Sequence, residues 1–317
     1  MISSLELARI CGVSQGTVDR ALHDRPGIRP KTKARILKIA ARHGYRPHPA
    51  TLELLHGRSS TVVAVGPDSN SLFFMDLFAS IRAALRQAGF RFVICPVSDA
   101  DEMLDALRDA AARRSRAAVV VPPADNIAIP ATLRNNLNIL SLLSPCKGRG
   151  LRFITPDEER TGRDAVAYLA AKGHRRILHL TYERQAYAIT ARRRGYTASM
   201  KTHGLKSTAL AQPGNEKLVA AVRQHGITAI FCHNDWLALA ALRALTEARL
   251  RVPEDVSVLG VDNSPTFVRH CPDMTTLEYP MGWLAQQVLH AVQDKPLARR
   301  APRFRLIERA TVGPPPA

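Results

Sequence analysis

The alternation of apolar and polar residues in the first 45 positions predicts three short helices. The first begins after Ser3, and Leu7, Ala8 and Ile10 form its apolar face at helical spacing. Ser3 and Glu6 have the spacing of a capping box, in which the Ser3 hydroxyl accepts from the Glu6 amide and the Glu6 carboxylate accepts from the Ser3 amide. This pattern defines the start of the helix.

A second helix is predicted directly behind the first, because Gly12 can adopt a positive φ and Ser14 can cap the helix that follows. Its inward positions are Val18, Ala21 and Leu22. The opposite, exposed face holds Gln15, Gly16, Thr17 and Arg20. Two short helices with a tight turn between them are typical of a helix-turn-helix that contacts base edges and phosphates.

The segment from Arg29 to Tyr45 predicts a third helix. Pro30 suits the first helical position, and Gly44 suits a left-handed stop. The buried stripe is expected to consist of Ile36, Leu37, Ile39 and Ala40.

From about residue 60 the pattern changes to apolar and β-branched runs that alternate with helical segments. Continuous apolar runs are typical of strands that are buried on both faces of a parallel sheet. Two successive open α/β sheets of this kind bind ligands at the carboxyl ends of their strands. The expected strands are 61–65, 91–95, 117–121, 138–142, 151–155, 177–181, 209–211, 229–232 and 256–261, with helices over 73–88 and 101–114.

The charge balance fits a nucleic-acid partner. The chain has 45 Lys and Arg against 27 Asp and Glu, a formal net charge of +18. Residues 1–60 hold eleven basic and four acidic side chains, or +7, and the remainder carries +11. Basic side chains suit phosphate contacts, whose counterion release makes affinity depend on salt. Because the remainder is basic too, a general preference for Arg is a second explanation.

Other protein classes find no support in the sequence. No apolar run approaches the roughly 20 residues of a membrane span, and the chain opens into a helix rather than a signal peptide, so a cytoplasmic location is expected. The five cysteines are not clustered, so no metal site is expected, and Cys95 and Cys232 are expected to be buried in strands. Without a dinucleotide, phosphate-loop or nucleophile motif, we expect neither a cofactor nor an enzyme.

Several motifs together resemble the LacI/GalR family of bacterial transcription factors. In the first part they are Val13 and Ser14 with Thr17, Val18 and Arg20, then the run 44–47 and Leu54; in the second part they are the runs 172–177, 232–235, 250–258, 260–262 and 275–277. The resemblance covers nearly the whole chain. It implies an α/β protein with a three-helix helix-turn-helix DNA-binding domain (1–48), a hinge (49–59) and a two-lobed periplasmic-binding-protein-like domain of doubly wound parallel sheets (60–312). The first lobe is expected to combine about 60–155 with 277–295.

The resemblance and the exposed face of the second helix together imply the DNA contacts. Gln15, Gly16 and Arg20 are expected to face the bases, and Arg20 can bind guanine bidentately or, alternatively, contact a phosphate. Leu54 matches the leucine that family members insert into the minor groove, although a plain linker residue remains the alternative. The other expected contacts are Ser14, Thr17, Thr32 and Tyr45.

Two positions of the DNA-binding part depart from the family pattern. Asp19 stands where a small hydroxyl residue is usual, and its carboxylate would repel phosphate unless Arg20 or Arg25 pairs with it. The hinge has Thr51 and Leu52 in place of the usual Ala-Arg before the wedge leucine. Both departures affect operator recognition rather than the fold.

The resemblance also implies an effector site between the lobes. Asp157, Arg192, Asn234 and Asp262 fall where family members hold polar groups of the effector, and Phe73 or Phe74 could stack on a ring. Each polar position has an alternative role, since Asp157 suits a helix cap, Arg192 a solvated basic face, and Asn234 or Asp235 the start of a helix.

The resulting hypothesis is an effector-responsive transcriptional regulator, by resemblance a repressor. A homodimer would bind a near-palindromic double-stranded operator, and a small molecule between the lobes, by resemblance a sugar, would control its affinity. The alternative is a cytoplasmic small-molecule-binding protein of the periplasmic-binding-protein fold without regulatory DNA binding.

Overall fold

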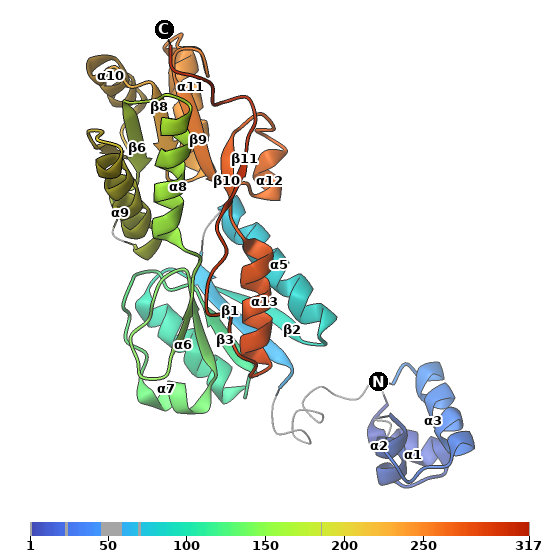
Figure 1. Cartoon of the computed structure of the whole chain (residues 1–317). Coiled ribbons are helices and arrows are strands. Elements are labelled where there is room, and N and C mark those ends of the chain that lie inside the picture. The colour runs from blue at the N-terminus through green and yellow to red at the C-terminus, as the bar shows by residue number, and fades with distance from the viewer. Residues whose placement is uncertain (1, 23–24, 46–58, 69–70, 185, 317) are drawn as a thin grey trace. The chain divides into compact units, whose positions relative to one another are not determined.

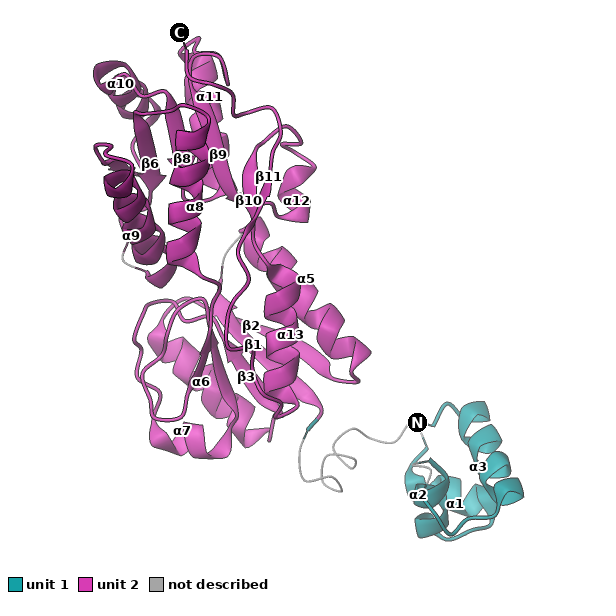
Figure 2. Ribbon diagram, viewed as in Figure 1, with its two compact units in different colours: residues 1–59 teal, residues 60–317 magenta. Residues whose placement is uncertain are grey.

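The chain folds into two compact units, residues 1–59 and residues 60–317 (Figure 2). The computed structural model describes residues 2–22, 25–45, 59–68, 71–184 and 186–316. We call the first unit the head and the second the body. Most of the expected hinge, including Leu54, lies outside the described residues.

The head contains three helices, α1 (Ser4–Cys11), α2 (Gln15–Leu22) and α3 (Pro30–Arg42). The predicted capping box is present, with the Ser3 amide donating to Glu6 at 2.6 Å and the Glu6 amide donating to Ser3 at 3.1 Å. Gly12 has a φ of 58°, and the Thr17 amide donates to the Ser14 hydroxyl at 3.2 Å. The predicted turn between the two helices is therefore confirmed.

The core of the head is narrower than the sequence predicted. Ile10 and Leu37, both expected on buried faces, are exposed, and Cys11 is buried in α1 instead. Three short helices meet along only one narrow stripe each, so an apolar residue at the border of a stripe stays in water. The buried core consists of Leu7, Ala8, Cys11, Val18, Ala21, Ile36 and Ala40.

The first lobe of the body is built on a five-stranded parallel sheet in the order β2-β1-β3-β4-β5 (Figure 1). The C-terminal helix α13 packs against α5, so this lobe is completed by a distant part of the chain. The strands are β1 (Thr61–Pro67), β2 (Arg91–Val97), β3 (Ala117–Val120), β4 (Ile139–Leu142) and β5 (Arg152–Ile154); the helices are α5 (Leu72–Gln87), α6 (Ala100–Ala112), α7 (Ala131–Asn136) and α13 (Met281–Val292).

The second lobe is built on a six-stranded sheet in the order β11-β10-β9-β8-β6-β7, in which β11 alone is antiparallel to its neighbour among the described pairings. Its strands are β6 (Ile177–Thr181), β7 (Thr208–Ala211), β8 (Ala229–Cys232), β9 (Ser257–Asp262), β10 (Thr276–Glu278) and β11 (Arg305–Ile307); its helices are α8 (Glu158–Ala171), α9 (Tyr187–Thr202), α10 (Asn215–His225), α11 (Asp235–Glu247) and α12 (Pro265–Val268).

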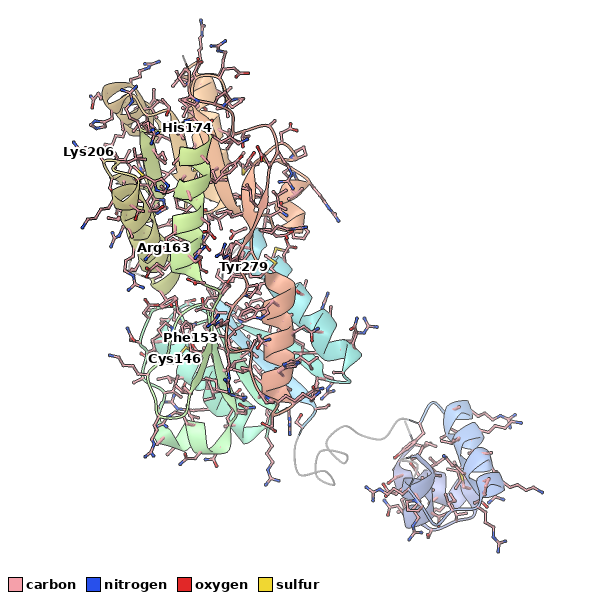
Figure 3. All side chains as sticks on the ribbon, in the orientation of Figure 1. Cys146, Phe153, Arg163, His174, Lys206 and Tyr279 are labelled. Carbon is pink, nitrogen blue, oxygen red and sulfur yellow. The ribbon has the colours of Figure 1, made fainter. Side chains whose placement is uncertain are left out.

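The chain passes between the lobes after β5, after β10 and before β11 (Figure 1). The return to the first lobe therefore begins after Glu278 rather than at the predicted residue 277. Tyr279 lies at this junction (Figure 3). Cys232 is buried as predicted, whereas Cys95 is only half-buried because β2 is an edge strand.

Candidate functional site

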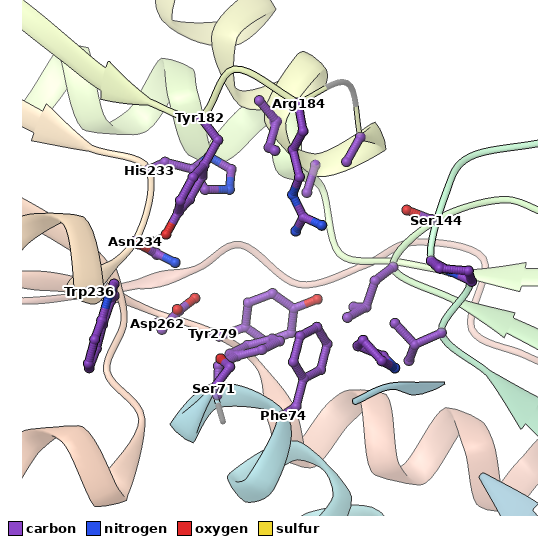
Figure 4. A pocket seen from close by; sticks show the side chains of 18 of the residues that line it. Ser71, Phe74, Ser144, Tyr182, Arg184, His233, Asn234, Trp236, Asp262 and Tyr279 are labelled. Atoms are coloured by element: carbon purple, nitrogen blue, oxygen red, sulfur yellow. Dashed lines mark hydrogen bonds between the residues drawn. The ribbon is translucent and has the colours of Figure 1, made fainter. Parts of the chain in front are cut away.

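A cavity of about 860 Å³ lies between the two lobes of the body (Figure 4). The first lobe lines it with residues that follow β1, β3 and β4, and the second with residues that follow β6, β8 and β9. These are the carboxyl ends of parallel strands, where open α/β sheets bind ligands. Of the six predicted effector residues, Phe73, Phe74, Arg192, Asn234 and Asp262 line the cavity.

An aromatic wall forms the side of the cavity that the first lobe contributes. Phe73 and Phe74 stand in the first turn of α5, and their rings meet edge to face with centroids 5.4 Å apart. Phe73 also contacts Tyr279, with 4.9 Å between the ring centroids. Such edge-to-face contacts hold the rings in place and leave an apolar surface for a ligand ring.

Arg192 is buried in an ion pair and is not part of a solvated face. Its Nε donates to Glu158 at 2.5 Å, and the two side chains are 4% and 1% exposed. Nη1 donates to the backbone carbonyl of His233. Burial raises the pKa of Glu158, and the charge of Arg192 partly offsets this. The ion pair fixes the orientation of the guanidinium at the wall of the cavity.

Asp262 ends β9 and points into the cavity (Figure 4). The residue is 8% exposed, and among the described residues burial and neighbouring charges, rather than a hydrogen bond, act on its carboxylate. Burial raises the pKa of Asp262 well above its ordinary value; Arg192 lowers it, while Asp235 and Glu158 raise it further. A buried carboxylate is unfavourable unless it is hydrogen-bonded, so this group is suited to accept hydrogen bonds from a ligand.

Asp235 positions the turn that carries Asp262. Its carboxylate accepts from the Asn263 amide at 2.7 Å and from the Thr276 hydroxyl at 2.6 Å. Asp262 and Asn263 have φ values of 126° and 48°, which L residues rarely adopt. The two hydrogen bonds of Asp235 therefore hold a strained turn, and burial raises the pKa of Asp235 to about 6.

Asn234 combines the two roles that the sequence left open. Its Oδ1 caps α11 by accepting from the Leu237 amide at 3.0 Å, and it also accepts from the Tyr182 hydroxyl at 3.1 Å. With the oxygen occupied, the amide nitrogen is turned towards the cavity (Figure 4). Asn234 can therefore donate to a ligand while it caps the helix.

Asp157 is not among the lining residues of the cavity. Its carboxylate caps α8 by accepting from the Arg160 amide at 2.9 Å, which is the alternative role considered above. Glu158, the first residue of the helix, lines the cavity in its place. A cap turns its side chain back over the first helical turn, so the next residue faces the ligand.

Other lining residues were not predicted from the sequence. Tyr279 and Tyr182 follow strands without a recognisable motif, and His233 lies in the run 232–235 but was not singled out. Only the fold brings the three side chains together. His233 is buried next to Tyr182, and burial lowers its pKa well below the ordinary histidine value. Among the described residues, no three His, Cys, Asp or Glu side chains are grouped as metal ligands.

The head presents a polar surface along α2. Gln15, Gly16 and Arg20 are exposed as predicted, and Thr17 is half-buried. The Ser14 and Thr17 hydroxyls are 2.9 Å apart, and the side-chain amide of Gln15 donates to the Ser4 hydroxyl at 2.7 Å. The Ser4 contact ties the first residue of α2 to α1.

Four further head residues bear on the predicted interface. Arg25 pairs with Asp19 at 3.1 Å, which supplies the compensation that the carboxylate requires. Thr32 is half-buried in the first turn of α3, and Tyr45 packs against the core of the head.

Comparison with known proteins identifies both units. Residues 5–48 match the model of bacterial regulatory proteins of the lacI family. Residues 166–312 match the periplasmic binding protein-like domain. The chain joins a LacI-family DNA-binding domain to a periplasmic-binding-protein-like domain. A DNA-binding domain and a ligand-binding body in one chain make this protein a transcriptional regulator that a small-molecule effector controls.

Relatives match this chain over most of its length. The regulator CelR of Thermobifida fusca is 25% identical over 95% of the chain and 94% of its own length. GalS of Salmonella typhimurium is 26% identical over 90% and 87%, and the repressor PurR of Vibrio vulnificus is 24% identical over 93% of both. All three are named as transcriptional regulators or repressors.

A solved structure shares the fold of the whole chain. The lac repressor dimer bound to operator and the anti-inducer ONPF superimposes with a TM-score of 0.82 at 22% identity, covering 98% of this chain and 99% of that one. Within the described residues, no helix has both the length and the apolar character that crossing a membrane requires.

Proposed function

We propose that this regulator is a repressor that binds a near-palindromic operator as a homodimer in the cytoplasm. In this proposal a sugar in the cavity between the lobes sets its affinity for DNA, and the protein is not an enzyme. A two-fold symmetric site requires two heads, which supports the dimer. The effector acts by binding one arrangement of the lobes more tightly than the other.

The buried carboxylate of Asp262 is the observation that carries the effector proposal. This carboxylate can accept hydrogen bonds from sugar hydroxyls. Hydrogen bonds to a charged acceptor are stronger than those between neutral groups. Arg192 and the amide nitrogen of Asn234 can donate to sugar oxygens, while Phe73 and Phe74 cover the apolar face of the ring. Two structural relatives support this class, since one is a CelR–cellobiose complex and another has bound ribose.

We propose that α2 lies in the major groove of the operator. Gln15 and Arg20 would contact base edges, with Gly16 allowing close approach, and Arg20 would discriminate guanine by about 1–3 kcal/mol. The remaining contacts to the backbone and minor groove are assigned to Ser14, Thr17, Thr32, Tyr45 and Leu54.

The first test is a gel-shift measurement on the DNA upstream of the protein's own gene, at several salt concentrations. We expect specific binding that weakens steeply as salt rises. Arg20→Ala should relax the preference for the operator. Equal binding to an unrelated fragment at moderate salt would contradict the proposal that this protein is a sequence-specific regulator.

The effector is tested by a thermal-shift screen against sugars. We expect at least one sugar to raise the melting temperature, because it binds the native state. Asp262→Ala should remove this shift while operator binding persists. If the variant still responds like the wild type, Asp262 is not part of the effector site.

A further inference from the structure

The chain enters the body between two arginines. Residues 60 and 61 stand at the start of β1, which lies between β2 and β3, at the edge of the first-lobe sheet that the amino ends of its strands form. The Arg91 amide donates to the carbonyl of Ser60 at 3.0 Å, and the Arg116 amide donates to the carbonyl of Thr61 at 2.8 Å. Neighbouring strands therefore place a basic residue on each side of the entrance.

Five more basic residues lie exposed around this edge. Because helices run antiparallel to the strands they connect, the helix ends and the loops before each strand gather here (Figure 1). Arg86 stands in the last turn of α5 before β2, and Arg113 and Arg114 follow α6 before β3. Arg149 precedes β5, and Lys295 follows α13. We call these five residues the linker-side face.

Few acidic groups neutralise this face. Asp294 pairs with Arg116 at 2.8 Å, and Asp109 lies 4.0 Å from Arg113. In the part of the chain that the structure describes, no ion pair involves Arg86, Arg114, Arg149 or Lys295. The linker-side face therefore has an excess of unneutralised positive charge beside the point where the head is attached.

Helix dipoles account for only part of this charge. Cations are favourable at the C-terminal end of a helix, which explains Arg86 in the last turn of α5 and Arg113 at the cap of α6. The effect falls off within that turn, whereas Lys295 stands three residues beyond Val292, and Arg149 belongs to a loop. A phosphate-binding role explains all five positions.

We propose that the linker-side face of the body contacts the phosphate backbone of the duplex that carries the operator. The proposal builds on the DNA-binding role of the head. The thirteen residues 46–58 that join the two units reach at most about 45 Å when fully extended, so the body stays tethered to the duplex that the head binds. Lys and Arg side chains bind phosphate without sequence preference, and each contact adds to the salt dependence of binding.

The test compares two triple variants of the full-length protein. Arg86→Gln, Arg114→Gln and Lys295→Gln together remove three charges from the linker-side face. Lys201→Gln, Arg223→Gln and Arg249→Gln remove three exposed charges from the second lobe as a control. The variants are matched, because Arg114 and Arg249 both follow a helix with positive φ (50° and 59°), and Arg86 and Lys201 both stand in last turns.

The measurement is the slope of log Kd against log salt concentration for operator DNA. Each lost phosphate contact should reduce the slope by about 0.9, so the linker-side triple variant should lose up to about 2.7 for each protomer of the homodimer that contacts the duplex. The control triple variant should match the wild type, and the thermal shift with the effector should persist in both.

Two results would overturn the proposal: an unchanged slope in the linker-side variant, or an equal fall in both variants, which would reflect total charge alone. Failure of the wild type itself to bind its operator specifically would instead refute the proposed function, so the two failures are distinguishable.

Discussion

The protonation state of Asp262 can couple the cavity to its ligand. Its carboxylate is buried next to the acidic groups of Asp235 and Glu158. Burial raises its pKa and so favours the protonated form in the empty protein. Effector hydroxyls that donate to this group would favour the ionised form instead.

We therefore predict that effector binding releases a proton and becomes tighter as pH rises. The ligand lowers the pKa of Asp262, so its affinity increases with pH until the carboxyl of the empty protein is itself ionised. Isothermal titration calorimetry in buffers of different ionisation enthalpy measures the released proton. Asp262→Asn should bind more weakly and lose most of this pH dependence. An unchanged pH dependence in that variant would assign the proton to Glu158 or Asp235.

Individual residues also show which parts of the cavity sequence patterns could not predict. Asp262 and Arg192 were predicted from motifs, and both line the cavity. Asp157 and Glu158 are adjacent carboxylates at a helix start, and only the geometry decides that the first caps the helix and the second faces the cavity. Tyr279 lies far along the chain from α5, so its contact with Phe73 forms only in the tertiary structure.

At the scale of elements, two glycines set the distance between α8 and α9. A Cβ atom on Gly162 would stand 2.1 Å from the carbonyl oxygen of Arg192, and one on Gly195 would stand 1.9 Å from that of Glu159. Each glycine thus lets the backbone of the other helix approach closely. Because Glu158 begins one helix and Arg192 lies on the other, this approach permits their ion pair.

We predict that Gly195→Ala destabilises the body and weakens effector binding together. Overpacking costs roughly 1–3 kcal/mol, and here the obstacle is backbone, which cannot rotate away. The separation of α8 from α9 should also disturb the orientation of Arg192. Thermal unfolding and effector titration measure the two effects.

Gly282→Ala is the matched control, because this glycine is also helical and nothing lies within 4 Å of its added Cβ. Alanine favours a helix over glycine by about 1 kcal/mol, so this control should be neutral or slightly stabilising. Equal melting temperatures for the two variants would contradict the role of Gly195.

Elements with strong local patterns were predictable, and those defined by distant partners were not. The strands at 177–181 and 229–232 have the predicted limits, because every residue of each strand is buried. β11 was missed, since its three residues are not fully buried and it forms only by pairing with β10. The same dependence on distant partners explains why most of the cavity lining was not predicted from the sequence.

At the scale of the whole molecule, hydrogen bonds between the lobes link the wall of the cavity to α5. Asp76 of α5 in the first lobe accepts from the Thr266 amide at 3.0 Å and from the Thr266 hydroxyl at 2.7 Å in the second lobe. It also accepts from the Ser264 hydroxyl, which belongs to the turn after Asp262. Movement of that turn on effector binding would therefore be transmitted directly to α5.

The proposed homodimer needs a surface, and the edge strand β2 has the properties of one. Val93 and Ile94 are 50% and 49% exposed on this strand, which forms one end of the first-lobe sheet. Exposed apolar side chains on an unpaired edge strand are unfavourable in a monomer and favour association with another chain. We assign this edge to the contact between two copies.

We predict that Val93→Glu weakens the dimer, since it places like charges on both sides of a two-fold contact. Operator affinity should fall by a factor of about 10²–10⁴, because the second head no longer binds as part of the same molecule. The effector's thermal shift should persist. Ala209→Glu is the control, because Ala209 is also exposed and lies on β7, an edge strand of the other sheet. Sedimentation velocity and gel shifts measure both effects, and a Val93→Glu protein that remains as dimeric as the control would exclude β2 from the interface.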